Sequence, residues 1–89
     1  MTSLQEQFEQ AVLHSKELPA KPEPQTLLAL YSLYKQATVG DVPDAKPGFT
    51  DIVARVKWES WDKIRGTSAP QAMQQYIDLV KNLQTSMAS

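Results

Sequence analysis

The chain has 89 residues, of which 42% are hydrophobic and 21% charged, and its formal net charge is −1. This balance is typical of one small globular domain and excludes a disordered segment. The near-neutral charge argues against a nucleic-acid-binding protein and against a polybasic membrane-binding surface. There is no cysteine, which excludes disulfides, thiolate metal sites and cysteine nucleophiles together. A fold held by packing alone suits a reducing compartment, so we expect a cytoplasmic protein.

No stretch of the sequence is suited to a membrane. The longest apolar run, LLALYSLY at residues 27–34, is far too short to span a bilayer and is typical of a buried helix segment. The first residues lack the positively charged start and the apolar run of a signal peptide. We therefore expect no integral membrane segment.

The first predicted helix begins at a capping box. Ser3 and Glu6 form the S-x-x-E pattern, and apolar residues follow at helical spacing as far as about Ser15. Three prolines between Pro19 and Pro24 then interrupt the chain, because proline lacks a backbone N–H and clashes with the preceding helical turn. Pro24 itself suits the first turn of the next helix.

Two further helices are predicted on either side of a long connection. The second runs over about residues 24–39 and ends at Gly40, which suits the left-handed conformation that often follows a helix. The connection, GDVPDAKPGFT, is rich in turn-forming residues and long enough for a crossover rather than a tight hairpin. The third helix is predicted over about residues 51–65, with Gly66 as its end.

The fourth predicted helix is long and amphipathic. Ser68 and Gln71 repeat the capping-box pattern. No strand alternation or internal repeat is visible, so four helices and one long connection predict an all-α protein, a small helix bundle forming one domain over residues 1–89. The apolar face of the fourth helix is marked by Ala72, Met73, Tyr76, Ile77, Val80, Leu83 and Met87.

Catalytic groups are hard to assemble from this sequence. Its one histidine, His14, lies beside Ser15, but adjacent residues on a helix point in different directions and make a poor nucleophile–base pair. We expect His14 to have a surface or helix-end role. The acidic residues are scattered, and their spacing provides no metal site. The sequence thus predicts a protein that is not an enzyme and has no metal or cofactor.

Two lysines lie at the edges of apolar helix faces. At about 100° per residue, Lys35 falls between Tyr31 and Leu28. Lys57 falls between Ile64 and Trp61. Each lysine could simply lay its aliphatic stem on apolar surface with its ammonium group in water. Two such lysines beside aromatic rings could also bind phosphate through charge-assisted hydrogen bonds, while the rings stack on a base. This second interpretation predicts a phosphorylated ligand that is partly aromatic and partly apolar.

The other aromatic residues are ambiguous on spacing alone. Trp58 and Trp61 are three residues apart and face similar directions, and tryptophans at helical spacing belong to a core more often than to a ligand site. Tyr76 lies on the apolar face of the fourth helix, and Tyr34 lies one turn from Leu30. Packing in the core would explain either tyrosine.

Four motifs together resemble the acyl-CoA-binding protein family. They are YSLYKQATVGD at residues 31–41, KPG at 46–48, KWESW at 57–61 and GTS at 66–68. The resemblance extends over residues 4–83 without a gap that shifts the motifs, and the combination of YxxYKQATxGD with KWxxW is highly specific. It implies a four-helix, up-down-down-up bundle with a shallow, bowl-shaped site for long-chain fatty acyl-CoA.

The resemblance also implies roles for individual residues. Tyr31, Lys35 and Lys57 match positions that bind the 3′-phosphate of CoA in this family, and Tyr34 and Tyr76 match positions that line the nucleotide and pantetheine part. The positions that border the acyl groove correspond to Phe8, Ala11, Val12, Leu28 and Trp58. The last of these is also a packing position, close enough to the site to report on binding.

Three functions therefore compete at the level of sequence. The first is a monomeric carrier and pool former for acyl-CoA, with no nucleic-acid partner. The second is a helical protein–protein interaction module whose groove takes a partner helix. The third, a thioester hydrolase, ranks last because the chain offers no nucleophile–base pair.

Overall fold

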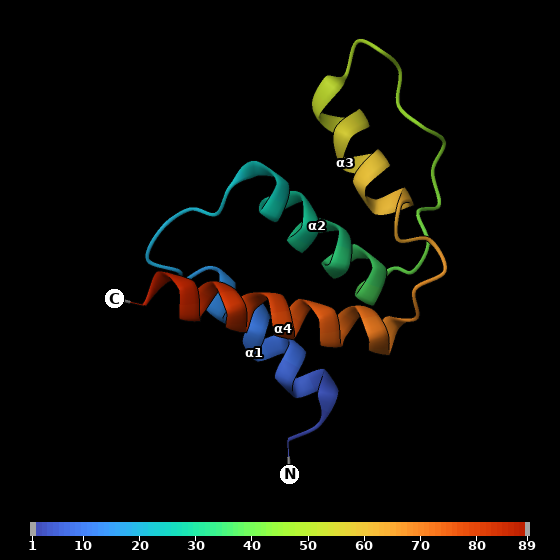
Figure 1. Cartoon of the computed structure of the whole chain (residues 1–89). Coiled ribbons are helices and arrows are strands. Elements are labelled where there is room, and N and C mark those ends of the chain that lie inside the picture. The colour runs from blue at the N-terminus through green and yellow to red at the C-terminus, as the bar shows by residue number, and fades with distance from the viewer. Residues whose placement is uncertain (1, 89) are drawn as a thin grey trace.

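Four α-helices make up the fold, as shown by a computed structural model that describes residues 2–88 (Figure 1). α1 and α4 run in one general direction and α2 and α3 in the other, and there is no strand in the described range. The predicted all-α, up-down-down-up bundle is confirmed. The helices are α1 at Leu4–Ser15, α2 at Pro24–Thr38, α3 at Ile52–Asp62 and α4 at Ala69–Met87.

Serine side chains cap α1 and α4, as predicted. Ser3 Oγ accepts the backbone N–H of Glu6 at 3.1 Å, and Ser68 Oγ accepts that of Gln71 at 3.3 Å. The Gln71 side chain accepts the Ser68 backbone N–H in return, at 3.2 Å, which completes the box. The Glu6 carboxylate instead accepts the Ser3 hydroxyl at 3.0 Å, so only half of the predicted box forms at α1.

The predictions for the ends of α2 and α3 were slightly too long. α2 ends at Thr38, one residue early, and Gly40 follows with a φ of 98° that glycine adopts without strain. α3 ends at Asp62, three residues early, because the chain tightens there: the Arg65 N–H bonds to the Asp62 carbonyl three residues back, at 3.1 Å. Gly66, with a φ of 89°, then turns the chain toward α4.

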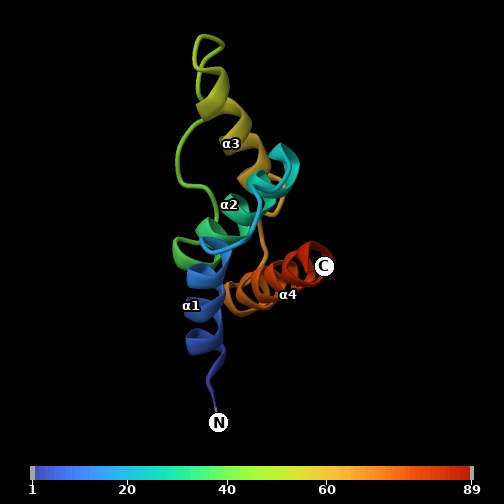
Figure 2. The same ribbon diagram turned by 90° about the vertical axis from the view of Figure 1, so that its left-hand side faces the viewer.

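The helices pack in series rather than all together. α4 contacts both α1 and α2, whereas α3 packs against α2 alone and projects away from the other helices (Figures 1 and 2). The long connection runs back along α3, as a crossover does. The core between α1, α2 and α4 is formed by Phe8, Ala11, Leu30, Leu33, Ala37, Ala72, Tyr76, Ile77 and Val80.

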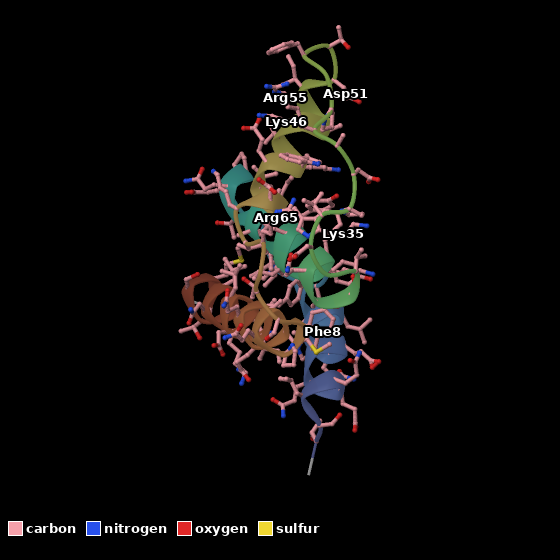
Figure 3. All side chains as sticks on the ribbon, turned by 90° about the vertical axis from the view of Figure 1, so that its right-hand side faces the viewer. Phe8, Lys35, Lys46, Asp51, Arg55 and Arg65 are labelled. Atoms are coloured by element: carbon pink, nitrogen blue, oxygen red, sulfur yellow. The ribbon has the colours of Figure 1, made fainter. Side chains whose placement is uncertain are left out.

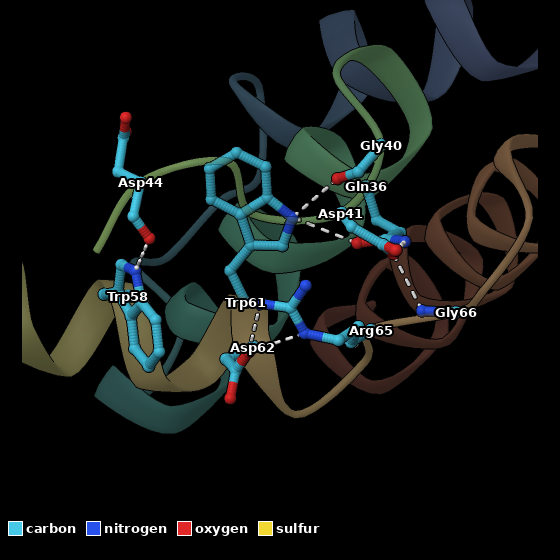
Figure 4. A network of polar contacts seen from close by, with 9 residues as sticks. All are labelled: Gln36, Gly40, Asp41, Asp44, Trp58, Trp61, Asp62, Arg65 and Gly66. Carbon is cyan, nitrogen blue, oxygen red and sulfur yellow. Dashed lines mark hydrogen bonds and ion pairs between the residues drawn. The ribbon is translucent and has the colours of Figure 1, made fainter. Parts of the chain in front are cut away.

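A buried amide fixes the crossing of α2 and α3 (Figure 4). Gln36 is 1% exposed, and its Oε1 accepts the indole N–H of Trp61 at 3.0 Å. Its Nε2 donates to Asp41 Oδ1 and to the Thr67 carbonyl, both at 2.8 Å. A buried amide left unpaired would cost about 1–3 kcal/mol, so this fully bonded one specifies a single arrangement.

The Asp41 carboxylate closes the same network. Its Oδ1 also accepts the backbone N–H of Gly66 at 2.8 Å. This bond, together with the one from Gln36, lowers the pKa of Asp41 below its usual range. The start of the long connection is thereby tied to the turn between α3 and α4.

Candidate ligand-binding site

Two adjoining open pockets lie beside α2, and Tyr31 lines both. The tyrosine pocket, of about 390 Å³, lies among α1, α2 and α4, and the tryptophan pocket, of about 220 Å³, lies between α2, α3 and the long connection. The tyrosine pocket is lined by Val12, Ser15, Lys16, Pro22, Leu27, Leu30, Tyr31, Tyr34 and Tyr76. The tryptophan pocket is lined by Tyr31, Val42, Asp44, Ala45, Pro47, Ala54, Lys57, Trp58 and Trp61.

Two ammonium groups flank the Tyr31 ring where the pockets meet. Lys57 Nζ lies 5.2 Å from the centre of that ring, and Lys35 Nζ lies 5.9 Å from it. Lys35 Nζ is also 5.9 Å from the Trp61 ring. Within residues 2–88 neither lysine forms an ion pair with a carboxylate. We call Tyr31, Lys35 and Lys57 the lysine corner, a place where positive charge is concentrated and can bind an anion.

Helical spacing on two helices creates this corner. Tyr31 and Lys35 are four residues apart on α2, and Lys57 and Trp61 are four apart on α3, so each pair shares a helix face. The Tyr31 and Trp61 rings meet edge-on, with centres 6.5 Å apart and an interplanar angle of 88°. Gln36 anchors Trp61, so the network in Figure 4 fixes the helix that carries Lys57 against the helix that carries Lys35.

Tyr76 lines the tyrosine pocket from α4, on the side away from the lysine corner. Its hydroxyl donates to Ser15 Oγ at 3.0 Å, and Ser15 Oγ donates to the Val12 carbonyl at 2.7 Å. Phe8 packs edge-on against Tyr76 and stacks on Tyr34, with ring centres 5.2 and 6.0 Å apart. Burial raises the pKa of Tyr76, while the hydrogen bond with Ser15 acts in the opposite direction. The phenol is therefore neutral near pH 7, as an apolar pocket requires.

Most of the residues predicted for the site lie at these two pockets. Lys35 lies beside Tyr31, and Phe8 is buried beneath two of the tyrosines. Figure 3 shows Phe8 and Lys35 at different heights of the molecule, with Lys35 nearer α3. The predicted residues that line a pocket directly are Val12, Tyr31, Tyr34, Lys57, Trp58 and Tyr76.

Two residues predicted for the acyl groove face other hollows in this structure. Ala11 borders a hollow between α1 and α4, since it is turned about 100° from Val12 on the helix. Leu28 borders a hollow between α2 and α3, together with Val56 and Ser60. Their contact with a ligand remains a prediction.

Several residues of the tyrosine pocket were not singled out from the sequence. Lys16 lies four residues after Val12, at the end of α1, so the helical-wheel argument applied to Lys35 would also have selected it. Ser15 was considered only as a nucleophile beside His14, whereas the structure places its hydroxyl against Tyr76. No sequence pattern distinguished the remaining lining residues from ordinary packing positions. They are Pro22, Leu27 and Leu30.

The described part of the chain was also searched for metal sites and for membrane-spanning helices. Residues 2–88 contain no group of three or more side chains that could hold a metal ion. In the same range, no helix has the length and apolar character needed to cross a membrane. The helical fold, the two pockets and the lysine corner define a small all-α ligand-binding protein.

Comparison with known proteins identifies the family. Residues 5–80 match the family described as Acyl CoA binding protein. The acyl-CoA-binding protein of Brassica napus is 44% identical over 86 residues, which cover 97% of this chain and 94% of the relative. That of Saccharomyces cerevisiae is 47% identical over 76 residues, covering 85% and 87%.

A solved structure agrees with these relatives. The crystal structure of Oryza sativa Acyl-CoA-Binding Protein 2 superposes with a TM-score of 0.90 at 40% identity, covering 98% of this chain and 100% of that one. The chain therefore belongs to the acyl-CoA-binding protein family, and the resemblance inferred from its motifs is confirmed.

Proposed function

We propose that this protein binds long-chain fatty acyl-CoA thioesters reversibly and acts as an intracellular carrier and pool former for them. In this proposal residues 1–89 form one domain that works as a cytoplasmic monomer, has no cofactor and catalyses no reaction. Membership of the acyl-CoA-binding protein family supports the ligand class. The structural observation that carries the proposal is the pair of ammonium groups flanking Tyr31 at the junction of two pockets.

The lysine corner suits the 3′-phosphate of CoA. Lys35 approaches from α2 and Lys57 from α3, and the Tyr31 hydroxyl can add a third donor. Hydrogen bonds to a charged group contribute about 1.5–3 kcal/mol each when partly shielded from water. Two or three such bonds on a single phosphate would provide much of the affinity for the nucleotide end.

The pockets suit the remaining parts of the ligand. In the proposal Tyr34 and Tyr76 line the nucleotide and pantetheine part. Apolar side chains cover the acyl chain and exclude water from it, so affinity for the chain comes from burial rather than from directional bonds. Release then needs no covalent step, as befits a carrier. The residues assigned to the acyl groove are Phe8, Ala11, Val12, Leu28 and Trp58.

A groove for a partner helix is the second candidate and is not favoured. The two pockets measure about 390 and 220 Å³, which suits parts of a small molecule better than the apolar face of a helix. The two cations at their junction, which pair with no carboxylate within residues 2–88, also favour a phosphorylated ligand. The family assignment likewise favours acyl-CoA over a partner helix as the ligand.

Acyl-dephospho-CoA, which lacks only the 3′-phosphate, tests the lysine corner. We expect it to bind about ten- to a thousandfold more weakly than acyl-CoA, because two or three charge-assisted bonds are lost. In Lys35→Ala this difference between the two ligands should shrink, since one partner of the phosphate is already missing. Four dissociation constants, measured by titration calorimetry at one salt concentration, give the coupling.

Lys63→Ala is the matched control, because it removes the same charge from an exposed position just after α3. It should leave the difference between the two ligands unchanged. If Lys35→Ala weakens both ligands equally, Lys35 does not bind the 3′-phosphate.

A further inference from the structure

Two hydroxyl groups meet at the tyrosine pocket, one from Ser15 at the end of α1 and one from Tyr76 on α4. Their oxygens are 3.0 Å apart, although the two residues are 61 positions apart in the sequence. A hydroxyl group can both donate and accept a hydrogen bond. The contacts around this pair therefore decide which of the two the pocket offers to a ligand.

The proton of Ser15 is used inside α1. Ser15 Oγ lies 2.7 Å from the carbonyl oxygen of Val12, which can only accept a hydrogen bond. Val12 belongs to the final turn of α1, where carbonyl groups have no N–H partner within the helix. The serine hydroxyl supplies a donor to this carbonyl. Since a serine side chain has a single proton, Ser15 has none to give to Tyr76.

The direction of the bond between the two hydroxyls follows from this. Ser15 Oγ can only accept, so the Tyr76 hydroxyl donates to it. The edge-on packing of Phe8 on the Tyr76 ring, with centres 5.2 Å apart, restricts the position of the phenol. Burial raises the pKa of Tyr76, so the phenol keeps the proton that it donates near pH 7.

The Tyr76 oxygen is left with its lone pairs as its only free hydrogen-bonding capacity. Within residues 2–88 no protein group donates a hydrogen bond to this oxygen. We propose that Ser15 is a positioning residue that makes Tyr76 a hydrogen-bond acceptor, so that the pocket selects a ligand presenting a neutral N–H group there. A ligand atom that can only accept would leave two sets of lone pairs facing each other.

This inference rests on the proposed function and adds a second kind of recognition to it. The lysine corner recognises charge, whereas Tyr76 would recognise the polarity of a hydrogen bond. Acyl-CoA carries such N–H groups in two places, in the amides of its pantetheine arm and in the amino group of its adenine. Both present the same chemistry to a phenol oxygen, and an experiment can tell them apart.

Analogues of acyl-CoA that lose one N–H group at a time test the selection. In one analogue hypoxanthine replaces adenine, so a carbonyl oxygen stands where the amino group was. In the others an ester oxygen replaces one pantetheine amide N–H. We expect the wild type to bind at least one analogue about tenfold more weakly than acyl-CoA, since the donor to Tyr76 is lost. Titration calorimetry at one salt concentration measures this penalty, and the analogue that shows it identifies the donor.

The same titrations with Ser15→Ala distinguish positioning from mere support of the fold. Without the serine, the Tyr76 hydroxyl can turn its proton toward the ligand, so the penalty should shrink to less than about threefold. Tyr76→Phe lacks the oxygen and should lose the penalty in the same way. Ser15→Thr retains a hydroxyl at this position and should keep it.

Ser86→Ala is the matched control for the substitution of Ser15. Ser86 Oγ donates to the Leu83 carbonyl at 3.1 Å, the same kind of bond within a helix, at an exposed position near the end of α4. This variant should keep the full penalty. Thermal melts followed by circular dichroism check that each variant is folded.

Two results would overturn the inference while leaving the proposed function intact. One is equal affinity of the wild type for acyl-CoA and for every analogue. The other is a penalty that stays at its full size in both Ser15→Ala and Tyr76→Phe, which would mean that Ser15 only supports the end of α1. A wild type that does not bind acyl-CoA at all would refute the proposed function, and this inference with it.

Discussion

Neighbouring residues around the lysine corner contribute very differently to the fold. The Trp61 indole is buried, and its N–H bonds to both Gln36 and the Gly40 carbonyl. The ammonium groups of Lys35 and Lys57 rest only against aromatic rings. Binding and folding can therefore be separated at this corner, one side chain at a time.

Substitution of these three residues tests the separation. Trp61→Ala should lower the free energy of unfolding by about 3–5 kcal/mol, since it leaves a cavity and removes the donor to the buried Gln36 Oε1. Lys35→Ala and Lys57→Ala should retain the wild-type melting temperature within a few degrees. Thermal melts followed by circular dichroism measure all three. Lysine variants that melt as early as Trp61→Ala would mean that the lysines are structural.

Tyr76 gives the fold a dependence on alkaline pH. Burial raises its pKa in the folded state above the usual value near 10. Its contribution to stability is complete below pH 10 and is lost as the pH rises through the folded-state pKa, because the unfolded chain ionises first. Tyr76→Phe lacks this ionisation. Urea midpoints between pH 8 and 11, taken for both proteins, should fall less steeply in the variant. Parallel curves would contradict the assignment.

At the level of elements, α3 is the helix with the least support. Among the helices it packs on α2 alone, and Ile52, Val53 and Val56 in its first half are exposed. Its C-terminal half is anchored by Trp61 and by Ser60, whose hydroxyl accepts that of Ser32 at 2.7 Å. Stability along α3 should therefore increase toward its C-terminus.

Native-state hydrogen exchange can resolve this gradient. Backbone amides in the first turns of α3 should exchange faster than those in the middle of α4, because local opening there breaks fewer buried contacts. Amides near Ile77 and Val80, which lie in the core, should be the slowest. Uniform protection across α3 and α4 would show that the two helices open only together.

For the whole molecule, the proposed apolar groove predicts how affinity depends on acyl-chain length. Each added methylene that enters apolar surroundings should contribute up to about 0.8 kcal/mol, or roughly fourfold in affinity. Affinity should rise along a series of saturated acyl-CoAs and level off where the groove ends. Titration calorimetry across the series measures the curve. A flat response would mean that only the CoA part is recognised.

Sequence reasoning succeeded where local chemistry decides the outcome. The serine caps, the glycine ends and the position of Lys35 at an apolar edge follow from helical periodicity and backbone preference. It failed where packing decides. The early end of α3 depends on a tightened turn after Asp62, and the hollows that Ala11 and Leu28 border depend on how the helices cross. No single-helix pattern contains those crossing angles.

The serial packing of the helices also bears on how the chain folds. Contacts run from α1 to α4, from α4 to α2 and from α2 to α3, so the central pair joins segments separated by all of α3 and two connections. Closing that long loop costs conformational entropy before the favourable contacts of the core can form. While α4 is still inside the ribosome, α2 and α3 can pair, but α1 has only its ring contact from Phe8 to Tyr34 on α2 and lacks α4, against which most of it packs. Collapse of the core must therefore wait for the last of the four helices, and the nascent chain would keep its apolar faces exposed until then.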